Sequence, residues 1–137
     1  IRPTFEYISF FKSVYRLADA WEIVQQTDDS DSTIILDAFH NWNSHSTLDD
    51  LKAIPLEKIS HYHIDDAAPG KPATTQTDPD RVMLGEGQID LAAEIEVLKA
   101  KGYDKTVSLE LFNAELWKQD PLEVITTGLT RMKALFT

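Results

Sequence analysis

Four side chains with metal-binding chemistry occur at widely separated points of the chain: Glu6, Asp37, His63 and Glu110. Three carboxylates brought to one place repel one another unless a cation neutralises them. Carboxylate oxygens combined with one imidazole favour Mn²⁺, Mg²⁺ or Co²⁺, and Zn²⁺ is the alternative. We therefore predict a site for one divalent metal ion, with these four residues as its ligands.

A metal ion held in this way leaves one or two positions for a carbonyl oxygen and a hydroxyl oxygen of a substrate. The ion would polarise the carbonyl as a Lewis acid, while a carboxylate moves a proton on the neighbouring carbon. Taken singly, Glu6 is explained as a surface carboxylate and Asp37 as a helix or turn cap. Glu110 lies between two leucines, and an unpaired buried carboxylate is costly, so it is harder to explain without a cation.

A histidine pair gives the same region a second chemical feature, because His61 and His63 are two residues apart in a short apolar run. In a strand such residues face the same side, so we expect Ile59 on their face and Tyr62 and Ile64 on the other. One interpretation is a pair of core histidines with satisfied hydrogen bonds. The other is a metal ligand at the carboxyl end of a strand.

Strands and helices must bring these side chains together. The continuous apolar run Thr33–Leu36 is typical of a strand covered on both faces in a parallel sheet. We predict strands at residues 2–8, 33–37, 58–64 and 106–112, each followed by a helix. Apolar stripes at helical spacing indicate the first and last helices: Val14, Leu17, Ala18, Trp21 and Val24, and Leu122, Ile125, Leu129, Met132 and Phe136.

Residues 1–137 are therefore expected to form a single α/β domain of four βα units. This amounts to half of a (β/α)8 barrel, in which functional residues gather at the carboxyl ends of the strands. The longest irregular segment, Asp65–Gln88, carries prolines and glycines, and loops of this length tend to be functional. Within it, Asp65 and Asp66 are expected to orient His63 or to form a polar rim.

Composition excludes several classes of partner. The net charge of −10 argues against nucleic acid and against an anionic membrane surface. The absence of cysteine excludes disulfides and thiolate chemistry. No apolar run is long enough to span a bilayer. The chain begins without methionine or the apolar core of a signal peptide, so we expect a fragment or processed chain of cytoplasmic location.

Four motifs resemble the xylose isomerase-like TIM barrel family, the sugar phosphate isomerase/epimerase superfamily. They are Asp37-Ala38-Phe39-His40, His61-Tyr62-His63-Ile64-Asp65-Asp66, the stretch Asp80–Asp90, and Ser108-Leu109-Glu110-Leu111-Phe112. The inosose (2-keto-myo-inositol) isomerase branch is the most similar. The resemblance covers nearly the whole chain and corresponds to the family's C-terminal half, strands five to eight and helices five to eight.

The resemblance implies a metal-dependent isomerase or epimerase of a keto-sugar or keto-cyclitol that works through an enediolate. The metal ligands would be the four residues named above, with Glu6 and Glu110 also removing and returning the proton. His40 and Arg81 would bind substrate, and His61 would support the site. The alternatives are a dehydratase of the inosose or 3-dehydroshikimate type and a half-barrel without activity. Four strands leave two open sheet edges, which favours a homo-oligomer or association with the other half of the barrel.

Overall fold

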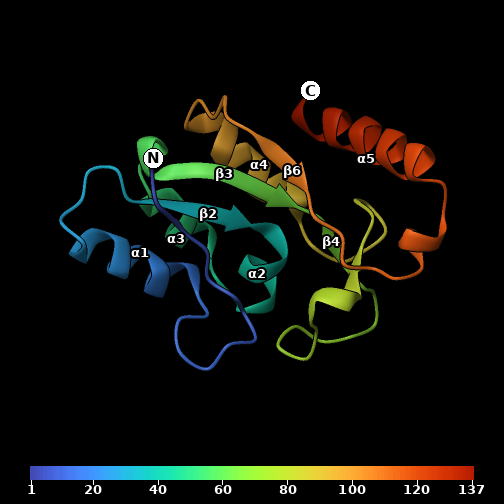
Figure 1. The fold of residues 1–137 in the computed structure, drawn as a ribbon, viewed down its shortest axis with the longest axis horizontal. Helices are drawn as coiled ribbons and strands as arrows, with labels where there is room; N and C mark the ends of the chain where they lie inside the picture. The colour runs from blue at the N-terminus through green and yellow to red at the C-terminus, as the bar shows by residue number, and fades with distance from the viewer.

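Four parallel strands lie side by side in the order β1–β2–β3–β6 in the computed structural model, which describes residues 1–137 (Figure 1). They are β1 (Thr4–Phe5), β2 (Thr33–Asp37), β3 (Ile59–Ile64) and β6 (Val107–Leu109). Every neighbouring pair is parallel. The predicted α/β fold with a parallel sheet is thus confirmed, and the carboxyl ends of all four strands meet at one edge.

The helices are α1 (Leu17–Gln26), α2 (Ala38–Asn43), α3 (Leu48–Ala53), α4 (Leu91–Ala100) and α5 (Pro121–Phe136). The side chains of Thr47, Asp90 and Asp120 each accept a hydrogen bond from a backbone N–H in the first turn of α3, α4 and α5. These caps satisfy donors that the helices themselves leave unpaired. No helix has both the length and the apolar composition that crossing a membrane requires.

The hydrophobic core lies between the sheet and helices α1, α3 and α4 (Figure 1). In α1 the buried residues are Leu17, Ala20 and Val24, while Trp21 packs at the edge of the core. The predicted inward position of Ala18 is wrong, because that residue is exposed. The core cluster comprises Tyr7, Leu17, Ala20, Val24, Ile34, Leu36, Ala38, Leu51, Ile54, Ile59, Tyr62, Ile64, Leu84, Leu91, Ile95, Val97 and Leu98.

The outer strands β1 and β6 are shorter than the sequence predicts, so Glu6 and Glu110 follow their strands instead of lying within them. The segment after β3 is less irregular than expected. It contains β4 (Asp66–Ala67) and β5 (Arg81–Val82), which pair antiparallel in a separate two-stranded ribbon. This ribbon brings Arg81 back toward the carboxyl edge of the main sheet.

Strand β3 contains an extra residue at Ser60. Ile59 pairs with Ile34 and His61 pairs with Ile35, so the register shifts by one residue between them. Such a bulge reverses the alternation of faces. Ile59 consequently belongs to the same buried cluster as Tyr62 and Ile64, and the prediction that it shares the face of His61 is wrong.

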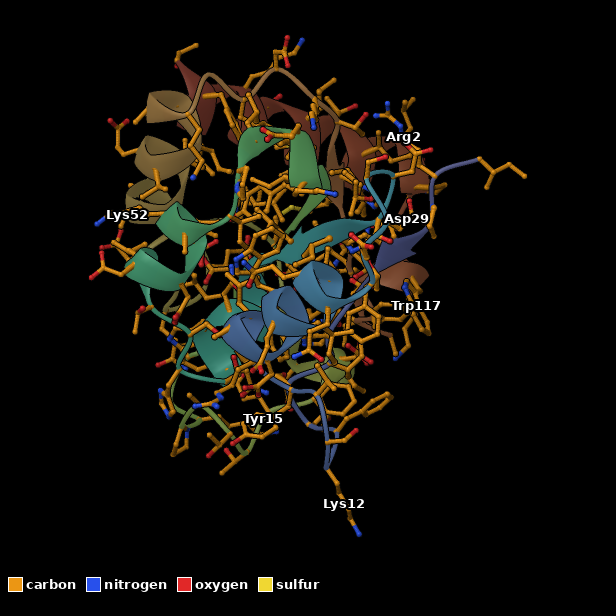
Figure 2. All side chains as sticks on the ribbon, turned by 90° about the vertical axis from the view of Figure 1, so that its left-hand side faces the viewer. Arg2, Lys12, Tyr15, Asp29, Lys52 and Trp117 are labelled. Atoms are coloured by element: carbon orange, nitrogen blue, oxygen red, sulfur yellow. The ribbon has the colours of Figure 1, made fainter.

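Helix α5 leaves most of its apolar stripe exposed. Leu122, Ile125 and Leu129 are 71%, 62% and 47% exposed, while Met132 and Phe136 pack against the core. Trp117, in the connection before the helix, projects from the surface and is 66% exposed (Figure 2). The side of the molecule next to β6 therefore carries an uncovered apolar surface.

Candidate metal centre

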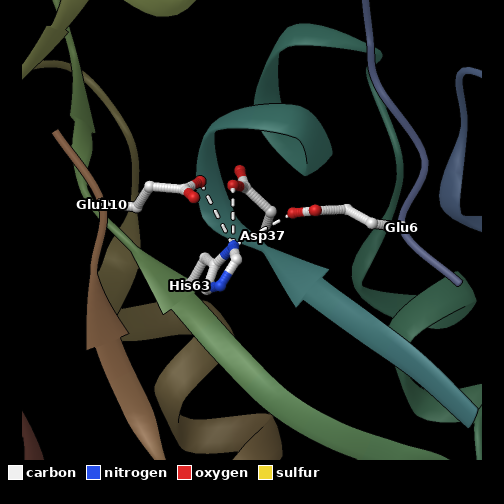
Figure 3. A group of neighbouring side chains, drawn as sticks. All are labelled: Glu6, Asp37, His63 and Glu110. Atoms are coloured by element: carbon white, nitrogen blue, oxygen red, sulfur yellow. Dashed lines mark hydrogen bonds and ion pairs between the residues drawn. The ribbon is translucent and has the colours of Figure 1, made fainter. Parts of the chain in front are cut away.

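One ligand atom from each of Glu6, Asp37, His63 and Glu110 lies within 4.8 Å of the others (Figure 3). The four residues come from the carboxyl ends of β1, β2, β3 and β6. Nδ1 of His63 is central, at 3.0 Å from Oε1 of Glu6, 3.2 Å from Oε2 of Glu110 and 3.8 Å from Oδ2 of Asp37. The structure thus brings together all four residues that the sequence singles out.

The charges of this cluster depend on His63. Burial lowers its pKa, but hydrogen bonds with Glu110 and Glu6 outweigh burial and raise the pKa to about 10. The same hydrogen bond with His63 lowers the pKa of Glu110. The protonated ring supplies one positive charge among three carboxylates. Their oxygens and Nδ1 converge as a mixed oxygen and nitrogen set that fits a divalent cation, whose binding would release the Nδ1 proton.

Asp37 is fully buried and uses both carboxylate oxygens. Oδ1 accepts a hydrogen bond of 2.7 Å from the backbone N–H of His40 and so caps α2. Oδ2 accepts one of 2.9 Å from Nη1 of Arg81 and faces His63. The alternative explanation of Asp37 as a helix cap is therefore correct, and it is compatible with a second role, because each oxygen serves a different partner.

Arg81 is fully buried at the centre of an acidic group. Its Nη1 donates to Asp37 and to Asp65, and its Nε donates to Asp78 at 3.2 Å. The guanidinium carbon lies 4.7 Å from the centre of the Phe39 ring. Burial lowers the pKa of Arg81, but the charges of Asp37 and Asp65 outweigh burial and raise it.

His40 is 1% exposed and contacts Arg81, with 3.1 Å between its Nε2 and Nη2 of the guanidinium. Because a guanidinium can only donate, Nε2 is the acceptor in this contact. Nδ1 lies 3.0 Å from Oγ of Ser9 and 3.4 Å from the backbone nitrogen of Ser9, whose N–H donates to it. Burial lowers the pKa of His40. The role of His40 and Arg81 in binding substrate stays a prediction.

Asp65 and Asp66 have partners other than those expected. Asp65 is paired with Arg81, burial raises its pKa, and its second oxygen has no hydrogen-bond partner. Asp66 accepts hydrogen bonds from the backbone N–H groups of Ala67, Gly85, Gly87 and Ile89. Asp65 therefore holds Arg81, and Asp66 fixes the loop that leads from β5 to α4.

A buried polar network behind the sheet has no counterpart among the sequence predictions. Glu94 of α4 accepts hydrogen bonds from Tyr62 Oη at 2.8 Å and from Asn41 Nδ2 at 3.1 Å, and Tyr7 Oη donates to Asn41. Burial raises the pKa of Glu94 to about 7. Three residues of the network are adjacent in sequence to Glu6, His40 and His63, namely Tyr7, Asn41 and Tyr62. This adjacency is visible in the sequence, but only the fold shows that the three residues contact one another or Glu94.

Comparisons with known proteins agree with this architecture. Inosose isomerase of Bacillus subtilis (strain 168) is 38% identical over 116 residues, which is 85% of this chain and 41% of that protein. A 3-dehydroshikimate dehydratase of Pseudomonas aeruginosa is 28% identical over 114 residues, which is 82% of this chain and 18% of that protein. The chain thus spans about two fifths of the length of the inosose isomerase it matches.

A solved structure shows the same arrangement of elements. The crystal structure of IOLI protein with a binding zinc atom superposes with a TM-score of 0.92 at 33% identity, covering 99% of this chain and 49% of that one. The four-stranded sheet is accordingly equivalent to half of a longer TIM barrel. The family model described as Xylose isomerase-like TIM barrel matches residues 2–135. This chain belongs to the xylose isomerase-like TIM barrel family.

Proposed function

We propose that the chain supplies the metal-binding half of an isomerase or epimerase that acts on a keto-sugar or keto-cyclitol. The observation that carries the proposal is the convergence of one imidazole nitrogen and three carboxylate groups within 4.8 Å at the carboxyl edge of the sheet. The 38% sequence identity to inosose isomerase of Bacillus subtilis supports a cyclitol ketone as substrate.

Glu6, Asp37, His63 and Glu110 would hold one divalent cation, for which Mn²⁺, Mg²⁺ and Co²⁺ suit the oxygen-rich set and the zinc-containing relative supports Zn²⁺. When bound, the cation supplies Lewis-acid polarisation of the substrate carbonyl. Protein groups do the remaining work. They bind the substrate, orient it and move its protons.

Proton transfer is assigned to Glu6 and Glu110. Their side chains are 26% and 28% exposed, whereas that of Asp37 is fully buried, so these two can reach a substrate. They lie on opposite sides of His63 (Figure 3). One carboxylate would remove a proton from the carbon beside the carbonyl, and the other would return it to the enediolate.

His40 and Arg81 complete the proposal as substrate-binding residues, as the resemblance implies. Both are buried beneath the cluster, so contact with substrate would require their side chains to become uncovered. Their contacts with Asp37 favour an additional role, which is to hold that carboxylate in place.

The open sheet leads us to propose that the chain associates, either with a second copy or with the rest of the barrel. Strands β1 and β6 each have an unpaired edge. A groove beside β6 is lined mainly by apolar side chains, among them Leu111, Trp117 and Ile125. Unpaired edges and apolar surface of this kind favour association.

The experiment is solvent deuterium exchange. The purified protein, loaded separately with Mn²⁺, Co²⁺ or Zn²⁺, is incubated in D₂O with a series of keto-inositols and ketoses, and incorporation beside the carbonyl is followed by mass spectrometry. We expect metal-dependent incorporation into one substrate class. Loss of water from the substrate would instead favour the dehydratase that the Pseudomonas relative suggests. Failure to bind metal and to exchange would reject an enzymatic role for this chain.

A further inference from the structure

A chain of hydrogen bonds runs behind His63, on the side away from the three carboxylates. Nε2 of His63 lies 3.1 Å from Nε2 of His61. Nδ1 of His61 lies 3.2 Å from Oγ of Ser60, and that hydroxyl donates to the carbonyl oxygen of Ile34 at 3.0 Å. Neither Ser60 nor His61 belongs to the proposed ligand set.

The protons of this chain can be assigned from donor and acceptor capacity. The carbonyl of Ile34 can only accept, so the single hydroxyl proton of Ser60 is used there. Toward its other neighbours Ser60 Oγ is then an acceptor, both for Nδ1 of His61 and for the hydroxyl of Thr4 at 2.8 Å. Nδ1 of His61 therefore carries a proton.

The next step fixes the ring of His63. Two ring nitrogens 3.1 Å apart form a hydrogen bond only if one of them carries a proton. A neutral His61 with its proton on Nδ1 offers a lone pair at Nε2, so His63 must donate from its own Nε2. When a cation displaces the proton on Nδ1 of His63, the neutral imidazole keeps its one proton on Nε2, and Nδ1 has a free lone pair. That atom is the one directed at Glu6, Asp37 and Glu110.

The bulge in β3 makes this arrangement possible. Ser60 is the extra residue between two paired positions, and its hydroxyl reaches back to the carbonyl oxygen of Ile34, the residue paired with Ile59. His61 and His63 are two residues apart and share a face by ordinary strand alternation. What the bulge changes is the place of Ser60, which would face away from both histidines in an unbroken strand but here has its hydroxyl 3.2 Å from Nδ1 of His61.

We propose that His61 is a positioning residue, which, set by Ser60, holds His63 in the tautomer whose Nδ1 is free for a cation. The inference rests on the metal site of the proposed function. It assigns His61 no contact with metal or substrate. Partners that orient a ligating histidine commonly change metal affinity by about 10- to 100-fold when they are removed.

The first test measures metal binding without catalysis. Zn²⁺ and Mn²⁺ affinities are determined by isothermal titration calorimetry for the wild type, His61→Leu, His61→Gln and Ser60→Ala. We expect His61→Leu to bind about 10- to 100-fold more weakly and His61→Gln to retain most of the affinity, because its amide oxygen can accept from His63. His45→Asn is the control, because His45 lies in the connection between α2 and α3 and asparagine tolerates its positive φ of 58°. Wild-type affinity in His61→Leu would overturn the proposal.

The second test does not require metal. Nitrogen-15 NMR of the metal-free wild type should show His61 with its proton on Nδ1, and Ser60→Ala should shift that proton to Nε2. A proton on Nε2 of His61 in the wild type would reject the assignment. If the wild-type protein fails to bind metal, the metal site of the proposed function is rejected. If the wild type binds metal and His61→Leu binds it equally well, only the positioning role of His61 is rejected.

Discussion

Oδ2 of Asp37 lies 2.9 Å from Nη1 of Arg81, and both side chains are buried. Arg81 thus contacts a member of the carboxylate cluster directly, and Oε2 of Glu110 lies 3.6 Å from the same Nη1. The guanidinium of Arg81 is always positively charged, so it reduces the repulsion among Asp37, Asp65 and Glu110. Without it, a bound metal ion would have to offset that repulsion alone. We therefore expect the region to fold without a bound metal ion.

Arg81→Met is expected to destabilise the fold by about 3–5 kcal/mol, since it leaves buried carboxylates without their partner. Urea unfolding in the absence of metal measures the change. Arg16→Met, which removes an exposed ion pair with Asp19, is the control and should leave the midpoint unchanged. Equal midpoints for Arg81→Met and the wild type would contradict the structural role of Arg81.

Glu110→Gln keeps the side-chain shape but removes the charge and the base. We expect weaker metal binding and at least about 100-fold slower proton exchange, because general base catalysis contributes roughly 10²–10⁴ in rate. Folding should persist, since the Glu110 side chain is 28% exposed and the neutral amide can still accept a hydrogen bond from His63. Glu115→Gln, which alters an exposed carboxylate paired with Lys118, should exchange at the wild-type rate. Near-normal exchange by Glu110→Gln would remove Glu110 from the mechanism.

The raised pKa of Glu94 predicts that the free energy of unfolding depends on pH. Its pKa is about 7 in the folded protein against an ordinary value of 4.5, so between these values the folded state binds more protons than the unfolded state. Stability must then fall as the pH rises from about 4.5 through 7, by at most about 3 kcal/mol for this group. Glu94→Gln should lack this component.

Urea unfolding of the metal-free protein at pH 5, 6, 7 and 8 separates the contribution of Glu94 from those of other groups, because only the difference between wild type and variant is used. Glu96→Gln, an exposed position on the same helix, is the control and should follow the wild type. If the free energy of unfolding changes with pH in the same way for Glu94→Gln and the wild type, the pKa of Glu94 is not raised in the folded protein.

Gly87→Ala should destabilise the loop before α4. A Cβ at this position would lie 2.3 Å from the carbonyl oxygen of Ala67 and from Oδ1 of Asp66, and such overpacking costs about 1–3 kcal/mol. Gly70 has a positive φ of 80° but open space around it, so Gly70→Ala should cost only about 1 kcal/mol. Thermal unfolding compares the two, and the reverse order would contradict the close contact.

Association can be tested by sedimentation velocity at micromolar concentration. We expect a species larger than the monomer of 15.5 kDa, since the edges of β1 and β6 and the apolar surface of α5 are uncovered. Trp117→Ser combined with Ile125→Ser should reduce association without entering the core. A monomer that unfolds cooperatively would show that the four-stranded sheet is stable with its edges open.

Much of the site could be predicted from the sequence, for a definite physical reason. Apolar runs identify strands, parallel strands end at one edge, and a polar residue at the end of each run must therefore lie near the others. Asp37 after Thr33–Leu36 and His63 near the end of its strand follow from this rule. Their convergence with Glu6 and Glu110 needs only the parallel topology that the order of strands and helices already implies.

Other features were decided by tertiary structure, because they depend on which atoms meet. The register shift at Ser60 moves Ile59 into the core. The pattern of apolar residues in the sequence gives no sign of this bulge. The sequence does not predict that Arg81 and Glu94 are buried, although the family resemblance assigns Arg81 to substrate. Only the ribbon β4–β5 and the packing of α4 bury these two side chains. The exposed stripe of α5 shows the opposite case. The spacing of its apolar residues correctly predicts a helix. Burying those side chains requires a neighbouring surface, which this chain does not provide.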